Sequence, residues 1–199
     1  MNPDYLTRRE AVARLSVLLG GTLIGAEAFL RGSPAAAPGT WAEFTPGEIA
    51  LLDEVGDTII PATDTPGAKA VGIGAFMVRI VRDCYNPAQQ ATFRAGLGEL
   101  ENTAKSSYGA AFLACRAEQR VALLNTLDAA QKQWHLDKRR DEPEHYFRMF
   151  KQLTILGYFT SEVGATQALR YVESPGSFDG NYPQHPGDRD WFRPAGSGI

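Results

Sequence analysis

Glu142 and His145 are the residues of this chain whose spacing is most typical of metal chemistry. A Glu-x-x-His pair inside a helix places two metal ligands on one face, as in di-iron helical bundles. Such a site needs a second Glu-x-x-His and two further glutamates, and Pro143 places Glu142 at the helix start rather than inside it. We therefore expect these residues and Glu144 to form a solvated helix N-terminus, where acidic side chains favour the helix dipole.

Two aspartates, Asp53 and Asp57, stand four positions apart and could serve as a carboxylate pair for acid–base catalysis. They lie opposite the apolar positions of the predicted helix, so we expect a solvated polar face instead. Gly72-Ile73-Gly74 begins like a dinucleotide-binding fingerprint, but the third glycine position holds Met77 and no strand pattern precedes it. Haem-attachment, phosphate-loop, zinc-helix and nucleophile-elbow motifs do not occur in the sequence. We expect no catalytic residue, cofactor site or metal site in this chain.

Helical periodicity dominates from Thr45 to Tyr171, and no segment keeps the two-residue alternation of a half-buried strand. The sequence predicts an all-α fold, with a single compact helical domain of about five to six helices over residues 38–173. Residues 174–199 are rich in aromatic residues, proline and glycine, which predicts an irregular C-terminal tail. Thr45 and Glu48 form a capping box that begins the first helix, and Pro61 ends it.

Each predicted helix carries an apolar stripe that we expect to face the core. Asn86 caps the third helix, which Gly96 and Gly98 weaken modestly. The stripes are Ile49, Leu52, Val55 and Ile59; Ile73, Phe76, Met77, Ile80, Val81 and Cys84; Phe93, Leu97, Leu100, Ala104 and Tyr108; Leu123, Leu127, Ala130 and Trp134; and Tyr146, Met149, Phe150, Leu153 and Leu156.

Residues 1–37 are similar to a bacterial twin-arginine export signal. Arg8 and Arg9 precede a weakly hydrophobic run from Leu15 to Leu30, and a stretch of small residues follows as a peptidase site. The run is diluted by glycine and is shorter than the roughly 20 apolar residues of a spanning helix. We expect the twin-arginine translocase to deliver the chain to the periplasm. That route exports folded proteins, so a chain without a cofactor motif is expected to travel bound to a partner that has one.

Composition narrows the remaining possibilities. The formal net charge is −3 at pH 7 and the basic residues are dispersed, so nucleic acid is not an expected partner. Two cysteines, Cys84 and Cys115, would meet an oxidising compartment after export. They could form a disulfide there, and the alternative is a pair of buried core thiols.

Three stretches, in their order and spacing, resemble the gluconate 2-dehydrogenase subunit 3 family. They are residues 59–68 (IIPATDTPGA), residues 157–171 (GYFTSEVGATQALRY) and the tail from Pro175-Gly176 through Trp191. The resemblance implies a helical, cofactor-free small subunit that is not itself an enzyme. It also implies a large FAD-containing partner of the glucose-methanol-choline type, which oxidises a sugar or sugar acid in gluconate 2-dehydrogenase or glucoside 3-dehydrogenase complexes.

In such complexes the small subunit stabilises the flavoprotein and carries it through the twin-arginine route. A cytochrome c subunit commonly takes the electrons onward, so the resemblance also allows membrane association through the complex. Two alternatives stand beside this interpretation. One is a transient periplasmic chaperone for such a flavoprotein, and the other is a stand-alone metal-dependent enzyme that uses Glu142, Glu144 and His145.

The same three stretches supply candidate residues for a partner interface. Asp64, Pro66 and Gly67 could instead close a tight turn, whereas several aromatic candidates, notably Tyr158, could equally belong to the core. The tail could grip another protein or lie across its own domain. The interface candidates are Asp64, Pro66, Gly67, Tyr158, Phe159, Glu162, Tyr171, Tyr182, Trp191 and Phe192.

Overall fold

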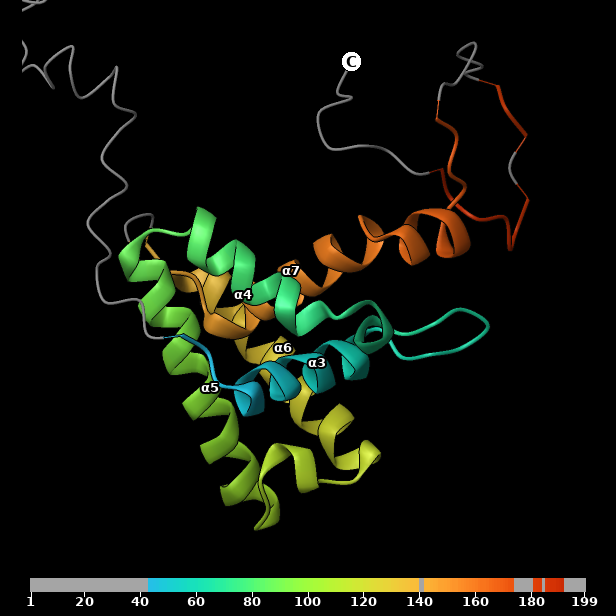
Figure 1. Ribbon diagram of the computed structural model, residues 1–199. Coiled ribbons are helices and arrows are strands. Elements are labelled where there is room, and N and C mark those ends of the chain that lie inside the picture. The colour runs from blue at the N-terminus through green and yellow to red at the C-terminus, as the bar shows by residue number, and fades with distance from the viewer. Residues whose placement is uncertain (1–42, 140–141, 174–180, 184, 192–199) are drawn as a thin grey trace, which may run out of the picture. The chain divides into compact units, whose positions relative to one another are not determined.

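The computed structural model describes residues 43–139, 142–173, 181–183 and 185–191 (Figure 1). Arg8 and Arg9 of the predicted signal and Phe192 of the tail lie outside the described residues. Almost all described residues belong to one unit, Phe44–Ile199, and the fold is that of this unit.

The described residues contain helices and no β-strands, which confirms the all-α prediction. The α-helices are α3 (Pro46–Ile59), α4 (Ile73–Cys84), α5 (Pro87–Tyr108), α6 (Ala117–Asp137) and α7 (Tyr146–Phe159). Two short 3-10 helices, η1 (Ala68–Val71) and η2 (Phe112–Ala114), lie in connections, and a π-helical turn, η3 (Gly164–Ala168), follows α7. An isolated parallel bridge joins Arg170 to Trp191.

Capping residues in the sequence explain where α3 and α5 begin. The backbone N–H of Thr45 donates to Glu48 at 2.7 Å, and the N–H of Glu48 donates to the Thr45 hydroxyl at 3.2 Å. Asn86 and Gln89 form an equivalent reciprocal pair at the start of α5. Both predicted caps are therefore confirmed, because each satisfies two of the amide groups that a helix N-terminus leaves unpaired.

Helix α7 is the centre of the core, since it contacts each of the other four α-helices (Figure 1). Phe150 is fully buried, and its ring packs edge-to-face on Phe93 of α5 with centroids 4.8 Å apart. Even Thr154 is buried, and its hydroxyl donates to the Phe150 carbonyl at 2.8 Å. Burying one such phenylalanine contributes about 1.5–3 kcal/mol, so α7 supplies much of the hydrophobic stabilisation of the domain.

Two glycines let neighbouring helices approach α7 closely. A Cβ atom on Gly96 of α5 would lie 2.5 Å from the Cβ and Cγ atoms of Tyr146. A Cβ atom on Gly157 would collide with the side chains of Ile73 and Phe76 on α4. From the sequence, Gly96 is expected only to weaken its helix. In the structure the absence of a side chain at Gly96 leaves a notch into which the side chain of Tyr146 on α7 packs.

The buried face of α6 differs from the predicted stripe. Leu123 and Leu127 are buried as expected, but Ala130 is exposed and Trp134 is 43% exposed, whereas Gln131 is buried. The side-chain amide nitrogen of Gln131 donates to Asp128 at 3.1 Å. The last turns of α6 extend past the core, so a stripe drawn to Trp134 overestimates how far the helix is covered.

Two further core predictions fail at helix ends or edges. Leu156 of α7 is 44% exposed, and Cys84, the last residue of α4, is exposed. Cys84 and the buried Cys115 are free thiols, so the disulfide that the sequence left possible is not formed, and the alternative of two core thiols holds for Cys115 alone. The 22-residue helix α5 lies between them in the chain and spans roughly 33 Å, which keeps their surroundings apart. None of the described helices is both long and apolar enough to cross a bilayer.

The packing predicts opposite effects of alanine at two neighbouring glycines of α5. Gly96→Ala should lower the free energy of unfolding by about 1–3 kcal/mol, because the new methyl group overpacks against Tyr146. Gly98→Ala is the matched control, since nothing lies within 4 Å of its Cβ position, and it should stabilise by about 0.5–1 kcal/mol. Urea unfolding followed by far-ultraviolet circular dichroism measures both, and equal stabilisation by the two variants would contradict the notch.

Candidate interaction surface at the end of helix α7

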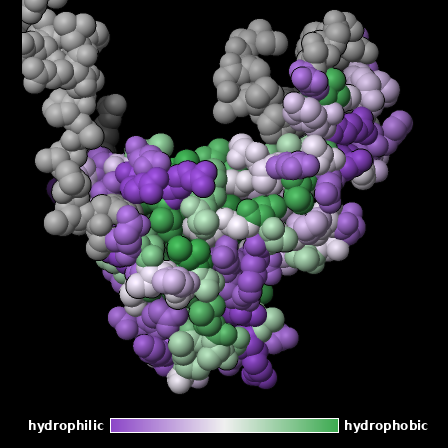
Figure 2. All heavy atoms as spheres, in the orientation of Figure 1, coloured by the Kyte–Doolittle hydropathy of each residue, from purple (hydrophilic) through white to green (hydrophobic). Residues whose placement is uncertain are grey.

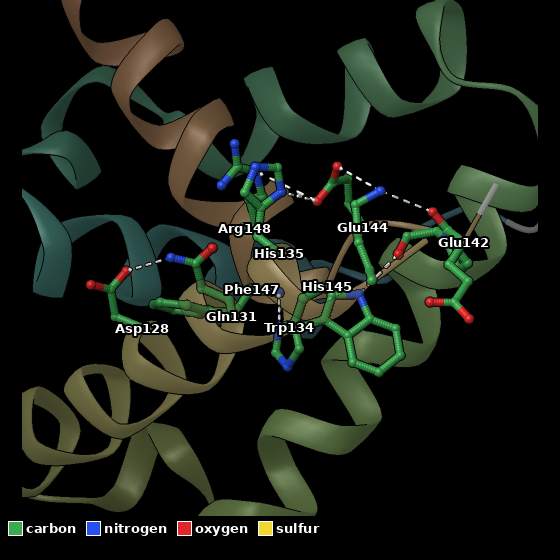
Figure 3. Close-up of polar contacts among 11 residues, drawn as sticks. Asp128, Gln131, Trp134, His135, Glu142, Glu144, His145, Phe147 and Arg148 are labelled. Carbon is green, nitrogen blue, oxygen red and sulfur yellow. Dashed lines mark hydrogen bonds and ion pairs between the residues drawn. The ribbon is translucent and has the colours of Figure 1, made fainter. Parts of the chain in front are cut away.

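The Glu-x-x-His residues separate into different structural roles at the junction of α6 and α7 (Figure 3). Glu144 lies between three basic side chains: His135 at 3.4 Å, Lys138 at 3.3 Å and Arg148 at 3.6 Å. Burial tends to raise the pKa of Glu144, but hydrogen bonds from Lys138 and His135 outweigh it, and the pKa is lowered. Glu142 instead pairs with Arg139 at 3.1 Å. The predicted solvated helix start is therefore an ion-paired junction.

His145 is the N-cap of α7. Its Nδ1 accepts a hydrogen bond from the backbone N–H of Phe147 at 3.2 Å (Figure 3). Its ring stacks on Tyr146 with centroids 4.6 Å apart. Burial lowers the pKa of His145, which favours the neutral ring that this cap requires. Burial raises the pKa of Tyr146 to about 12. Among the residues the structure describes, no three His, Cys, Asp or Glu side chains gather as metal ligands.

The aspartates of α3 also have structural partners, contrary to the expected solvated face. Asp53 accepts a hydrogen bond from the backbone N–H of Gly74 at 2.7 Å, near the start of α4. Asp57 accepts one from the N–H of Lys69 at 3.3 Å, near the start of η1. Gly72, the N-cap of α4, has no side chain that could cap it. The carboxylate of Asp53, which is distant in sequence, takes the capping role. The glycine at the start of the predicted helix is the sequence signal that could have indicated a cap from elsewhere in the chain.

A shallow, open pocket of about 210 Å³ lies where α3, α6 and α7 meet. Asp128 at its rim bonds to Lys132 and Lys151, which lower the pKa of its carboxyl to about 2. The pocket is smaller than the roughly 300–1,000 Å³ of typical ligand sites. Its lining residues are Thr58, Ile59, Val121, Leu124, Asn125, Asp128, Phe147 and Lys151.

The loop after α3 is a tight turn whose shape depends on Gly67. Gly67 is buried, and a Cβ atom there would lie 2.5 Å from Asp57 Oδ1 and 2.7 Å from the backbone nitrogen of Ala62. The turn alternative therefore holds for Gly67, whose buried position leaves it little surface to offer a partner. Asp64 is exposed at the tip and accepts a hydrogen bond from the Thr63 hydroxyl at 2.8 Å.

Tyr158 ties this loop to the end of α7. Its side chain is 1% exposed, and its hydroxyl donates to the Pro66 carbonyl at 2.8 Å. The Thr65 hydroxyl lies 3.3 Å from the same oxygen. The core alternative therefore holds for Tyr158, whereas Phe159 beside it is only half-buried. Residues 59–68 and 157–171, two of the stretches singled out from the sequence, lie side by side.

The chain then turns sharply into η3. The Ser161 hydroxyl donates to the Tyr158 carbonyl at 2.6 Å and accepts from the N–H of Gly164 at 3.1 Å. Glycine is required at 164, because a Cβ atom would collide with the Tyr158 carbonyl oxygen. Glu162 is exposed on the outside of this turn. The π-helical turn after α7 changes the direction of the chain, and π-helical segments are frequent at functional sites.

Residues 181–183 and 185–191 of the tail, hereafter the C-terminal strap, lie against η3. The N–H of Arg170 donates to the Asp190 carbonyl at 2.8 Å, and Arg189 donates to the Gln167 carbonyl at 2.6 Å. Tyr182 and Trp191 pack edge-to-face with ring centroids 5.6 Å apart. This part of the tail therefore folds back onto its own domain at η3, which agrees with the second of the two arrangements that the sequence allowed.

Apolar side chains remain exposed around the strap. Their exposed fractions run from 43% to 50%, and we call the group the terminal surface. Elsewhere on the unit, Figure 2 shows apolar residues (green) reaching the surface over the helices, between polar ones (purple). Exposed aromatic residues held in fixed positions are typical of protein interaction sites. The terminal surface consists of Tyr171, Val172, Tyr182 and Trp191.

Comparison with known proteins identifies the family. The sequence model of gluconate 2-dehydrogenase subunit 3 matches residues 46–176, from the first residue of α3 to a point beyond η3. The chain belongs to the gluconate 2-dehydrogenase subunit 3 family. No curated protein and no solved structure gives a significant match.

Membership of the gluconate 2-dehydrogenase subunit 3 family makes the chain an accessory subunit of a dehydrogenase complex. The resemblance noted from the sequence is confirmed over the helical part of the chain. Tyr171 and Val172 lie inside the matched range, whereas Tyr182 and Trp191 lie beyond its end. The sequence did not indicate Arg170, although an arginine among aromatic residues is a typical cation–π signal.

The Tyr158 hydroxyl predicts a measurable link between loop and helix. Tyr158→Phe should lower the free energy of unfolding by about 0.5–1.5 kcal/mol, because the Pro66 carbonyl loses its donor in a part-buried place. Tyr108→Phe is the control, since that tyrosine of α5 has no hydroxyl partner among the described residues. Urea unfolding measures both variants, and equal effects would show that the Tyr158 hydroxyl contributes nothing.

The cap of α7 predicts a pH-dependent stability. The pKa of His145 is lower in the folded chain than its ordinary value of 6.5, so the unfolded chain binds this proton first as the pH falls. Stability from this residue is complete above pH 6.5 and declines as the pH falls toward the folded pKa. His145→Asn keeps a capping side chain without a titrating ring, so unfolding midpoints should decline less between about pH 7 and 5. Identical declines in both proteins would rule out His145 as the source.

Proposed function

We propose that this chain is the non-catalytic small subunit of a periplasmic, FAD-dependent dehydrogenase of the glucose-methanol-choline type, which oxidises a sugar or sugar acid. The family match over residues 46–176 is the observation that carries the proposal. The subunit assembles with the large flavoprotein, stabilises it and supplies the signal for its twin-arginine export. Hydride transfer from substrate to FAD takes place in the large subunit, and a cytochrome c subunit receives the electrons.

The roles of the polar residues support a binding function. The carboxylates and the histidine that the sequence singled out are engaged in helix caps and ion pairs, as for Asp53 and His145. The pocket between α3, α6 and α7 is small for a cofactor. These residues hold the helical domain in shape, and the exposed features at the end of α7 are free to contact a partner.

The proposed interface is built from surfaces of different character. The terminal surface offers aromatic side chains, which give large contact area for little conformational entropy. The turn after α3 adds the exposed Asp64 and the half-buried Pro66, and the outside of η3 adds Glu162. Because Tyr158 and Arg170 connect these segments to α7, the interface is expected to be largely pre-formed and to bind with little ordering cost.

Export supplies the second part of the proposal. Arg8 and Arg9 form the predicted twin-arginine pair, and the translocase that reads such a pair carries folded proteins. FAD is inserted into the large subunit before export in this scheme, so one signal on the small subunit serves both chains. The complex then resides in the periplasm and is held at the membrane through its cytochrome subunit.

A single co-purification tests assembly and export together. The chain, tagged at its C-terminus and expressed in its own host, should yield a periplasmic complex with flavin absorbance and a large subunit at about equal stoichiometry. Replacing both Arg8 and Arg9 with Lys should leave both subunits in the cytoplasm, whereas Arg14→Lys, outside the pair, should not.

The other outcomes of this experiment argue against the proposal. A colourless, solitary chain in the periplasm would exclude a stable subunit and favour a transient chaperone. Stoichiometric metal in that solitary chain would favour the stand-alone enzyme instead. A flavoprotein that reaches the periplasm normally with the Arg8/Arg9 double variant would exclude the escort role.

A further inference from the structure

We propose that Arg170 is the positioning residue of the partner interface. Its contacts hold the C-terminal strap in place, so that Tyr182 and Trp191 face the large subunit as one pre-arranged aromatic pair. This inference rests on the proposed function for the identity of the partner, and on the geometry of the strap for the role of Arg170.

The contacts of Arg170 converge on the strap from its backbone and its side chain. Its guanidinium donates to the Tyr182 hydroxyl at 3.2 Å and pairs with Asp188 at 3.4 Å. The guanidinium carbon lies 5.2 Å from the centre of the Trp191 ring. Its backbone N–H donates to the Asp190 carbonyl at 2.8 Å, within the isolated bridge that joins Arg170 to Trp191. One residue thus contacts both members of the aromatic pair and the segment between them.

The chemistry of these contacts requires arginine. The guanidinium is planar and carries five N–H donors in a fixed fork, so it can donate to a hydroxyl and a carboxylate while its face lies near an aromatic ring. A lysine at 170 would keep the charge and the backbone bond but would lose this simultaneous geometry. The Lys variant therefore separates the effect of charge from the effect of shape.

The strap depends on such contacts because burial does little to hold its aromatic residues. Arg189 donates to the Gln167 carbonyl, and Asp188 accepts from the N–H of His185 at 2.9 Å within the strap itself. Tyr182 and Trp191 are 49% and 43% exposed, so the core does not hold them by burial. Surface ion pairs and exposed cation–π contacts are individually weak. Their convergence on Arg170 makes attachment of the strap sensitive to this residue.

A fixed strap matters for binding because ordering a loose segment lowers affinity. Aromatic side chains contribute most to affinity when they are already in position, because binding then does not have to lower their conformational entropy. Removing Arg170 should therefore weaken binding to the large subunit without changing the helical core.

The first measurement concerns the strap alone. Hydrogen–deuterium exchange of the purified full chain should show faster exchange in residues 167–172 and in the strap for Arg170→Ala, because the amide of Arg170 loses its bond to the Asp190 carbonyl. Exchange in α7 should be unchanged, which distinguishes release of the strap from general destabilisation. Arg139→Ala is the control, since among the residues that the structure describes Arg139 pairs locally with Glu142. Unchanged exchange in Arg170→Ala would overturn the inference.

The second measurement uses the FAD-loaded large subunit that co-purifies with the wild-type chain. The dissociation constant should rise about tenfold for Arg170→Ala, less for Arg170→Lys and not at all for Arg139→Ala. Wild-type affinity of Arg170→Ala would overturn the role in binding. If the wild-type chain binds no flavoprotein, the proposed function fails, whereas the exchange result still reports whether Arg170 holds the strap.

Discussion

Burial of helix α7 is the constraint on which the rest of the structure depends. The helix contacts all four other α-helices, and its residues from Tyr146 to Tyr158 supply the centre of the core. Close approach requires glycine where neighbours meet it, at Gly96 on α5 and at Gly157 on α7 itself. Interiors pack as densely as organic crystals, so the position of each surrounding helix follows from the shape of α7.

The two ends of α7 therefore have different structural roles. At its N-terminus, His145 and Glu144 join α6 to α7 through a cap and a set of ion pairs. At its C-terminus, Tyr158 holds the turn after α3, and the chain then passes through η3 to Arg170 and the strap. The features proposed to meet the partner therefore extend from the best-packed element of the domain. A binding surface connected to a rigid core keeps its shape in the free subunit, which lowers the ordering cost of assembly.

The acidic residues of α3 have structural partners in the domain, both backbone amides and basic side chains. Asp53 and Asp57 accept from amides near the starts of α4 and η1, and Glu54 between them pairs with Lys69 and Arg120. Carboxylates near helix N-termini gain from the unpaired N–H groups and from the helix dipole. A face that the sequence marks as polar can therefore be structural without being catalytic. This use of the acidic residues agrees with an accessory role in a dehydrogenase complex.

The sequence alone determined the all-α class, the caps of α3 and α5 and the family, because these depend on residues close together in the chain or on motifs in fixed order. Only the tertiary structure decided that Tyr158 is core, that Gln131 rather than Ala130 is buried, and that Cys84 is exposed. It also brought Arg170 to the strap. Periodicity indicates which face of a helix is apolar, but the neighbour that covers it and the length covered depend on contacts between residues far apart in sequence.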